Sequence, residues 1–341
     1  MNEIYGDKLK ALINVKDTYS YYRDTCDKVC DYYNVEYSKM VKSVETLRNH
    51  PNVFAWYVDD ETALCGIDEM TNLTMTIREK DINHPCYSVY WQYLDTTKYL
   101  PTFDAYGLDL YPINISAIID VYTHQKVIYD EGFGTRSTWP VIQAMNYEAY
   151  YFQDPVKFKG KYVRAPTQQE MRVMTWLGFI GGAKGVFYYS FFDLVFMNDK
   201  GDPFEEKWKD VVKVTDEVFA LKDVILSIEE AGKYSVIVDD ELVVFLKKRL
   251  DKYDYLIIAN GDEKQTRKIS VELLTDEYEI IMGNGICDKT DHQLNIKINP
   301  IDVYIIKIKS KSEIQKDEGY YIIILCGILM LAIIILSFIE F

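Results

Sequence analysis

The sequence has little of what metal and disulfide chemistry require. Its six cysteines are scattered over 341 residues, and only Cys26 and Cys30 lie close together, on a stretch that favours a helix. No second cysteine pair or nearby histidine completes a zinc-binding pattern, and the four histidines stand alone. The spacing permits a structural disulfide but assigns none. We therefore expect no metal site and no cofactor.

Positive charge is also scarce. The chain has 38 Lys and Arg residues against 53 Asp and Glu residues, a net charge of −15, and no dense basic patch. This balance argues against a nucleic-acid partner, because the chain has no cluster of basic side chains to bind phosphate groups. Aromatic residues, in contrast, are abundant, with 29 tyrosines and 5 tryptophans. Such rings usually build cores, but they also suit a carbohydrate partner, because flat rings stack on the apolar faces of sugars.

The first two thirds of the chain alternate between strand-like and helix-like stretches. The strand-like runs are 9–15, 53–58, 87–91, 105–110, 139–144 and 185–190. Helices are expected over 25–47, 168–178 and 203–221, and a capping box of Thr167 and Glu170 opens the second of them. This alternation predicts an α/β fold with a parallel sheet and right-handed crossovers.

The pattern changes at about residue 227. Seven short strand-like runs follow, at 234–238, 242–247, 253–259, 269–273, 279–282, 294–298 and 302–308. Short strands at close spacing, separated by glycine-containing turns, predict an antiparallel β-sandwich. We therefore divide the chain into an α/β domain over 1–226, a sandwich over 227–308 and a polar linker over 309–320.

Residues 321–339 form a run of 19 residues without a charged side chain. At about 1.5 Å per residue a helix of this length crosses the hydrocarbon layer, so we expect a transmembrane segment that attaches the protein to a membrane. A cleaved lipid-anchor signal is the alternative.

The signals for membrane orientation conflict. Lysines before the run favour a cytosolic folded part, and the first ten residues do not resemble a signal peptide. Sequons at Asn72 and Asn114 favour an extracellular or lumenal one, which is our expectation.

The most informative stretch is 52–61, with the sequence NVFAWYVDDE. Its apolar residues show no polar alternation, which is typical of a strand buried on both faces of a parallel sheet. The strand runs directly into Asp59, Asp60 and Glu61. An acidic surface turn would be the simpler interpretation, but in α/β folds the chemistry lies just beyond the carboxyl ends of the strands.

Later strand ends carry the side chains that a sugar site needs. The residues at or beyond those ends are Trp91, Asp109, Tyr111, Gln143, Asn146 and Tyr189. Rings supply stacking surface, while carboxylates and amides bind hydroxyl groups. Glycoside hydrolysis uses two carboxyl groups, and clustering raises the pKa of one of them, as a proton donor near neutral pH requires.

Four blocks of the sequence resemble the later part of a TIM-barrel glycoside hydrolase. In order they are HPNVFAWYVDDE, YLPTFDAYGLDLYPI, WPVIQAMNYE and RAPTQQEMRVMTWLGFIGGAKGVFYYSF. The resemblance implies a (β/α)8 barrel, and in this superfamily a β-sandwich often follows the eighth strand.

The resemblance also implies roles for single residues. Retaining members of a clan within this superfamily carry their acid/base glutamate at the end of the fourth strand, usually after an asparagine. The resemblance therefore implies that Glu61 is the proton donor and that Asp60 stands in place of that asparagine. The seventh strand departs from the pattern, because Gln143 stands where a nucleophilic glutamate is expected. Three interpretations stay open: another carboxylate such as Asp109 is the partner, the enzyme inverts, or the site binds sugar without cleaving it.

A second departure concerns length. With 52–61 as the fourth strand, 9–15 is the third, so the first two strands are missing and a closed barrel cannot form. A shortened N-terminus or a degenerate homologue would explain this, and an open six-stranded sheet would leave apolar edges.

Together, these observations predict a membrane-attached glycoside hydrolase-like protein that acts on an extracytosolic glycan. The expected catalytic residues are Glu61, Asp60 and Asp109, and the expected substrate contacts are Asp59, Trp91, Tyr111, Gln143, Asn146 and Tyr189. The alternative is a catalytically inactive carbohydrate-binding or structural surface protein on the same scaffold.

Overall fold

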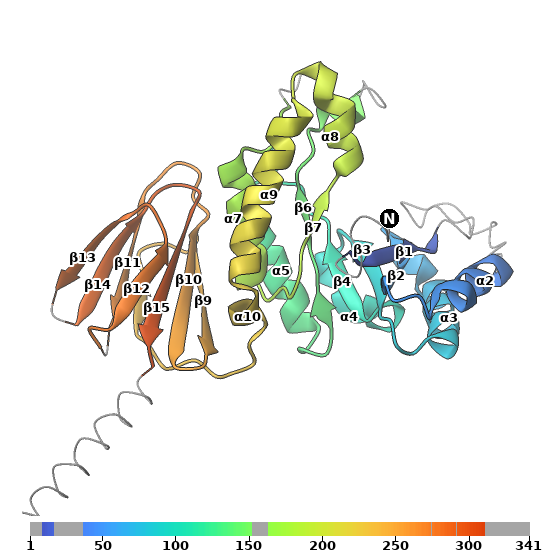
Figure 1. The fold of residues 1–341 in the computed structure, drawn as a ribbon, viewed down its shortest axis with the longest axis horizontal. Helices are drawn as coiled ribbons and strands as arrows, with labels where there is room; N and C mark the ends of the chain where they lie inside the picture. The colour runs from blue at the N-terminus through green and yellow to red at the C-terminus, as the bar shows by residue number, and fades with distance from the viewer. Residues whose placement is uncertain (1–8, 17–36, 152–162, 274, 291, 311–341) are drawn as a thin grey trace, which may run out of the picture. The chain divides into compact units, whose positions relative to one another are not determined.

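The computed structural model describes residues 9–16, 37–151, 163–273, 275–290 and 292–310. The chain divides into two compact units, residues 1–215 and 216–341 (Figure 1). The predicted transmembrane run over 321–339, nearly all of the linker before it and the first part of the predicted helix 25–47 lie outside the described residues. Within the described ranges, no helix has both the length and the apolarity needed to cross a membrane.

The first unit is an α/β domain built on parallel strands. Its strands are β1 (Ala11–Asn14), β2 (Val53–Asp60), β3 (Cys86–Tyr90), β4 (Ala105–Leu108), β5 (Ser137–Thr138), β6 (Val141–Gln143) and β7 (Phe187–Tyr189). The helices that follow or precede them are α2 (Tyr37–Leu47), α3 (Ile67–Lys80), α4 (Thr96–Tyr99), α5 (Asp120–Glu131), α6 (Glu148–Tyr151), α7 (Gln168–Ile180), α8 (Phe191–Met197) and α9 (Phe204–Ala220). The chain passes from the first unit to the second within α9. Single 3-10 turns complete the unit: η3 (Leu64–Gly66), η4 (Tyr93–Asp95), η5 (Leu100–Thr102) and η6 (Asn198–Lys200).

The strands lie side by side in the order of the sequence. One parallel sheet has the order β1-β2-β3-β4-β5, and β6 pairs in parallel with β7. Only Trp139 and Pro140 separate β5 from β6, and Pro140 has no N–H with which to continue the ladder. Backbone bonds from Lys184 N to Thr138 O at 2.9 Å and from Phe187 N to Pro140 O at 2.9 Å carry the pairing across this break. The six strands expected from the sequence are therefore confirmed as a parallel array.

Helices cover one face of this array, where a cluster of apolar side chains joins β2 to α2 and α3. Trp56 and Val58 pack there against Met40 and Val44 of α2 and Leu73 of α3. A second cluster is drawn from strands and strand ends, and its members are Leu12, Tyr57, Tyr87, Val89, Ala105, Tyr111, Trp139, Val141 and Phe187. The uninterrupted apolar pattern of the strands follows from burial on both faces.

The edge of the sheet at β1 is apolar, as expected for an open array. A hollow of about 380 Å³ lies beside this strand. Its lining residues are Leu9, Lys10, Ala11, Ile13, Leu47, His50, Asn52 and Val53. An apolar edge of this kind is a surface on which further chain can pack.

The capping box predicted for α7 is confirmed. The Thr167 hydroxyl accepts from the backbone N–H of Glu170 at 3.2 Å, and the Glu170 carboxylate accepts from the backbone N–H of Thr167 at 2.7 Å. Arg164 holds the same carboxylate with two bonds of 2.6 Å. These hydrogen bonds fix the residue at which α7 begins.

The second unit is the predicted antiparallel sandwich, preceded by the short helix α10 (Lys222–Leu226). Its strands are β8 (Val236–Val238), β9 (Val243–Leu250), β10 (Tyr253–Asn260), β11 (Arg267–Glu272), β12 (Tyr278–Met282), β13 (Ile286–Thr290), β14 (Gln293–Ile298) and β15 (Asp302–Lys309). They form two four-stranded sheets, β12-β15-β10-β9 and β13-β14-β11-β8, around one apolar core. The seven predicted strands are confirmed; β13 was missed because ICDKT lacks the apolar alternation of a half-buried strand.

A close contact between β3 and β4 requires a glycine. The Tyr87 side chain is buried and its hydroxyl donates to Trp139 O at 2.9 Å, after crossing over Gly107 of β4. A Cβ at residue 107 would lie 2.1 Å from the Tyr87 hydroxyl oxygen.

We therefore expect Gly107→Ala to lower the free energy of unfolding by about 1–3 kcal/mol, because an added methyl overpacks a fixed ring. Chemical denaturation measures the change. Gly185→Ala is the matched control, since its Cβ would lie at an ordinary 3.4 Å from Trp139. Equal losses in the two variants would contradict the packing argument.

Candidate active site

The last residues of β2 point their carboxylates into different surroundings. Asp59 is buried, and its carboxylate accepts from the Tyr90 hydroxyl, from the Thr62 hydroxyl at 2.5 Å and from the backbone N–H of Asp60 at 2.8 Å. Burial raises the pKa of Asp59 to about 6, although these hydrogen bonds oppose the shift. Asp59, predicted to contact substrate, therefore has its oxygens occupied by the loop and by β3.

Glu61 follows β2 in a strained backbone conformation. Its φ is 57°, in the left-handed region that residues with a side chain seldom adopt, and its N–H donates to Val89 O at 2.8 Å. Conformations of this kind persist where the surrounding structure imposes them, and they cluster at functional sites. The Glu61 side chain is half-buried.

Asp109 directly follows β4, and its carboxyl group lies beside that of Glu61. Burial raises the pKa of Asp109 well above the ordinary range, and the neighbouring carboxyl groups of Glu61 and Asp60 raise it further. Its Oδ1 is shielded from solvent and has no partner among the described residues. Burial and the neighbouring carboxylates thus both favour the protonated form of Asp109.

Asp60 is the exposed member of the carboxylate group. Its Oδ2 lies 3.3 Å from Nζ of Lys16, just past the end of β1, and Nζ also lies 5.5 Å from the centroid of the Tyr57 ring. The Asp60 charge also contributes to raising the pKa of Asp109, so the two carboxylates are near neighbours. The structure thus brings together the three residues predicted to be catalytic.

Tyr147 lies near these carboxylates, and its hydroxyl contacts the backbone of one of two stacked tyrosines. Tyr111 stacks on Tyr189 of β7, with ring centroids 5.6 Å apart and planes inclined by 23°. Tyr147 donates its hydroxyl to Tyr111 O at 3.1 Å. Burial raises the pKa of Tyr147 to about 12, and the charges of Asp109 and Glu61 contribute. Tyr111 and Tyr189 were predicted site residues, whereas Tyr147 was missed; its position one residue past Asn146 in the strand-end block MNYE was the available signal.

The side-chain amides of Gln143 and Asn146, at and beyond the end of β6, form hydrogen bonds within the protein. Gln143 is buried, accepts from Ile113 N at 2.9 Å and donates to Met145 O at 3.3 Å. Asn146 donates to the Asp202 carboxylate at 2.7 Å and accepts from Glu148 N at 2.9 Å. Both were predicted to bind substrate, and in the structure both hold the loops around the site.

Trp91 follows β3, between the strands that carry Glu61 and Asp109. Its side chain is 56% exposed. An indole exposed to this extent at a strand end is available for stacking. Over the described parts of the chain, no group of three or more His, Cys, Asp or Glu side chains could hold a metal ion.

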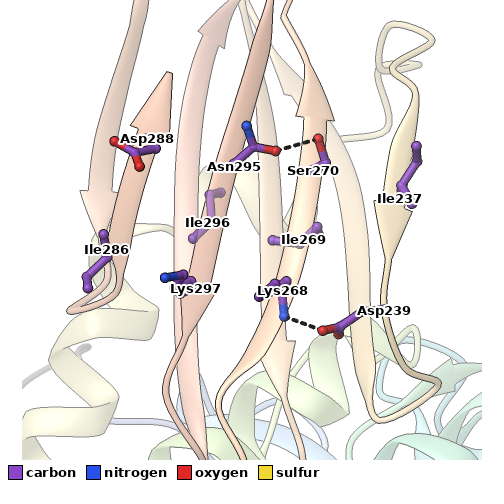
Figure 2. Close-up of a pocket in the computed structure, with 10 residues that line it drawn as sticks. All are labelled: Ile237, Asp239, Lys268, Ile269, Ser270, Ile286, Asp288, Asn295, Ile296 and Lys297. Carbon is purple, nitrogen blue, oxygen red and sulfur yellow. Dashed lines mark hydrogen bonds between the residues drawn. The ribbon is translucent and has the colours of Figure 1, made fainter. Parts of the chain in front are cut away.

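A second hollow, on the sandwich, has a different chemical character. Its volume is about 370 Å³, and it lies over the sheet β13-β14-β11-β8 (Figure 2). Its two carboxylates, Asp288 on β13 and Asp239 just past β8, are separated by β14 and β11, about 14 Å at the usual strand spacing. They cannot share a proton or act on one bond, so the candidate site is the one on the first unit.

Comparison with known proteins finds similarity in structure only. No family model matches the sequence, and no curated protein matches it. An α-amylase from H. orenii aligns at a TM-score of 0.51 with 12% identity, over 81% of this chain and 65% of that enzyme. Amy13B from Eubacterium rectale (TM-score 0.49, 11% identity, 81% and 64% of the chains) and an Anoxybacillus α-amylase (0.49, 11%, 81% and 63%) align less well.

This chain thus spans a little under two thirds of the length of these structures. At this level of identity the alignment with the H. orenii enzyme concerns the fold. The chain has the fold of the α-amylase-type glycoside hydrolases, a TIM-barrel-like domain followed by an antiparallel β-sandwich, as the sequence resemblance predicted.

Proposed function

We propose that this protein is a glycoside hydrolase that cleaves O-glycosidic bonds by carboxylate acid–base catalysis, with Glu61 as the proton donor. The observation that carries the proposal is the closeness of the Asp109 and Glu61 carboxyl groups at the carboxyl ends of β4 and β2, with Glu61 in a left-handed conformation. Proton donors of glycosidases are carboxyl groups whose pKa is raised, and Asp109 supplies such a group beside Glu61.

The two members of the pair have separate tasks. Asp109 is shielded and has the raised pKa, so it keeps the proton in the resting site. Glu61 is half-exposed and is the member that a substrate reaches first. As the bond between the anomeric carbon and the glycosidic oxygen breaks, the proton passes from Asp109 through Glu61 to that oxygen, and the alcohol leaves. Water then adds to the anomeric carbon and returns a proton to the pair.

Asp60 is the ionised carboxylate of the proposed mechanism. Carboxyl groups that flank a glycosidic bond are about 5 Å or more apart, so Asp109 and Glu61, whose carboxyl groups lie beside each other, cannot stand on opposite sides of one bond. Asp60 forms an ion pair with Lys16 at 3.3 Å and is therefore charged. Its negative charge stabilises the positive charge that develops at the anomeric carbon.

The substrate class is a carbohydrate. The stacked rings of Tyr111 and Tyr189 and the exposed indole of Trp91 offer flat apolar surfaces for sugar rings. The fold shared with an α-amylase supports an O-glycosidic substrate.

A second function, sugar binding without cleavage, is favoured by one observation. Gln143 stands at the end of β6, where the resembling enzymes place a nucleophilic glutamate. Its side-chain oxygen and its side-chain nitrogen each form a hydrogen bond with the backbone. This site would then bind the glycan through the tyrosines and leave it intact. Hydrolysis of a glycan by the unchanged protein decides between the two functions.

We further propose that residues 321–339 attach the protein to a membrane, with the folded part extracellular or lumenal. The charge-free run of 19 residues supports the membrane anchor. The sequons at Asn72 and Asn114, both exposed, support an extracellular or lumenal position of the folded part.

Glu61→Gln is expected to lower kcat/KM by about 10²–10⁴-fold, because glutamine cannot deliver a proton. The measurement is hydrolysis of a panel of aryl glycosides and soluble polysaccharides, starch included. Glu148→Gln, a neutral change on α6 near the same strand ends, is the matched control and should keep the activity. Undiminished hydrolysis by the Glu61 variant would remove Glu61 from the mechanism.

Asp109→Asn should shift the pH profile. In the unchanged protein the raised pKa of Asp109 keeps the proton in the pair at neutral pH, so activity is lost only as pH rises through that raised value. Asparagine cannot hold this proton, so the alkaline limb of kcat/KM should move toward acid pH. An unchanged limb would assign the proton to another group.

Glycosylation tests the proposed side of the membrane. After expression of the full chain in a eukaryotic host, peptide-N-glycosidase should increase the electrophoretic mobility of the protein. Replacement of both Asn72 and Asn114 by Gln should abolish this shift. A protein insensitive to the glycosidase would have its folded part in the cytosol.

A further inference from the structure

One carboxylate oxygen of Asp59 binds the residues on both sides of Glu61. Its Oδ1 accepts from the backbone N–H of Asp60 at 2.8 Å and from the Thr62 hydroxyl at 2.5 Å. Between these two hydrogen bonds lies Glu61, whose φ of 57° is in the left-handed region. We call Asp59 and Thr62 the Glu61 clamp, because their contact spans the residue between them.

The clamp belongs to a closed ring of buried hydrogen bonds. Oδ2 of Asp59 accepts from the Tyr90 hydroxyl, which lies 3.1 Å from Oγ1 of Thr102. Thr102 donates to Tyr99 O at 2.8 Å, and the Tyr99 hydroxyl donates to Thr62 O at 2.9 Å. All five side chains are at most 3% exposed. Since a buried polar network with its partners in place is rigid, the ring fixes Thr62 through both its hydroxyl and its carbonyl group.

A carboxylate in this ring is costly for the fold. Burial raises the pKa of Asp59 to about 6, so above that pH the ring contains a charge that its surroundings disfavour. Apolar side chains of similar volume often replace buried charged groups without loss of stability. A strand end that departs from this rule is therefore expected to serve the site rather than the packing.

The backbone of Glu61 needs restraints from its surroundings. A left-handed residue with a side chain is strained and persists only where the rest of the structure imposes it. The Glu61 N–H donates to Val89 O at 2.8 Å, which joins the turn to β3, and the clamp restrains the residues on either side. Without the clamp we expect φ of Glu61 to relax to a negative value, which would move its carboxyl group away from Asp109.

We propose that Asp59 and Thr62 are positioning residues, which hold Glu61 in its left-handed turn and thereby keep its carboxyl group beside that of Asp109. This inference rests on the proposed function, in which Glu61 delivers the proton. Asp59 then acts on catalysis through Glu61, and not through the substrate contact that the sequence suggested.

The test removes one hydrogen bond of the clamp and keeps the shape of the side chain. In the full chain, Thr62→Val should lower kcat for aryl glycosides by about 10–100-fold, because a displacement of about 1 Å is enough for such a loss. KM should stay within about twofold, since neither member of the clamp touches substrate. Thr62→Ser keeps the hydroxyl and should restore most of the activity.

Thr138→Val is the matched control. The Thr138 side chain on β5 is buried as deeply as that of Thr62, and its hydroxyl accepts from Nε2 of Gln125 at 2.7 Å. This variant therefore also loses a buried hydrogen bond, but one that does not involve the turn at Glu61. It should keep kcat.

A double-mutant cycle distinguishes a positioning role from a general structural one. If Thr62 acts through Glu61, Thr62→Val should have no further effect on kcat in a protein that already carries Glu61→Gln. A general loosening of the fold would lower kcat by the same factor in both backgrounds.

A second readout does not depend on hydrolysis. Burial raises the pKa of Asp109 and the neighbouring Glu61 carboxyl group raises it further, so displacement of Glu61 should lower it. Carbon-13 NMR titration of the Asp109 carboxyl, assigned with Asp109→Asn, should give a lower midpoint in Thr62→Val than in the unchanged protein or in Thr138→Val. Tyr90→Phe removes the bond to Oδ2 of Asp59 and leaves the clamp itself, so it should lower the midpoint less.

Three results would overturn the positioning role. They are an Asp109 midpoint that does not move in Thr62→Val, equal losses of kcat in the two Glu61 backgrounds, and an equal loss in Thr138→Val. The proposed function fails separately, if Glu61→Gln hydrolyses glycosides as fast as the unchanged protein or if the unchanged protein hydrolyses none. The NMR titration then decides by itself whether the clamp holds Glu61.

Discussion

The parallel order of the strands is the constraint on which the rest of the structure depends. Because β1 to β7 follow one another in sequence order and in one direction, all of their carboxyl ends meet at the same edge. Side chains far apart in the sequence, such as Glu61 and Asp109, become neighbours there. This edge holds Asp59, Asp60, Glu61 and Asp109, and the apolar strands lie beneath it.

Burial then divides the carboxylates among different tasks. Asp59 is enclosed by hydrogen bonds from Tyr90 and Thr62, so it supports the strand end. Asp109 is enclosed next to another carboxyl group, so its proton is retained. Asp60 faces Lys16 and stays charged. Three aspartates of identical intrinsic chemistry thus differ because desolvation and neighbouring charge differ at each position.

The fold was largely predictable, because it follows from local patterns. Uninterrupted apolar runs identified the parallel strands, and closely spaced runs with turns identified the sandwich. Where the pattern was weak the prediction failed, as at β13, whose residues are mostly polar and exposed. The division of one strand into β5 and β6 depends on Pro140, whose effect on the ladder is visible only when both neighbours are in place.

The candidate site was predicted in outline. Their positions at strand ends indicated Glu61, Asp60 and Asp109. Gln143 and Asn146 also stand at or beyond a strand end, but their amides form hydrogen bonds with backbone groups of the surrounding loops. Tyr147 lies on a loop, where no periodicity identifies which side chains turn inward.

The sequence by itself determined which residue types reach the active edge, because strand length and direction are local properties of the chain. Only the tertiary structure decided which of them touch. The Glu61–Asp109 contact and the stack of Tyr111 on Tyr189 join different strands, and their geometry depends on strand register and on the left-handed turn at Glu61. Contacts between distant segments, and the desolvation that sets their pKa values, arise only when the whole sheet has assembled.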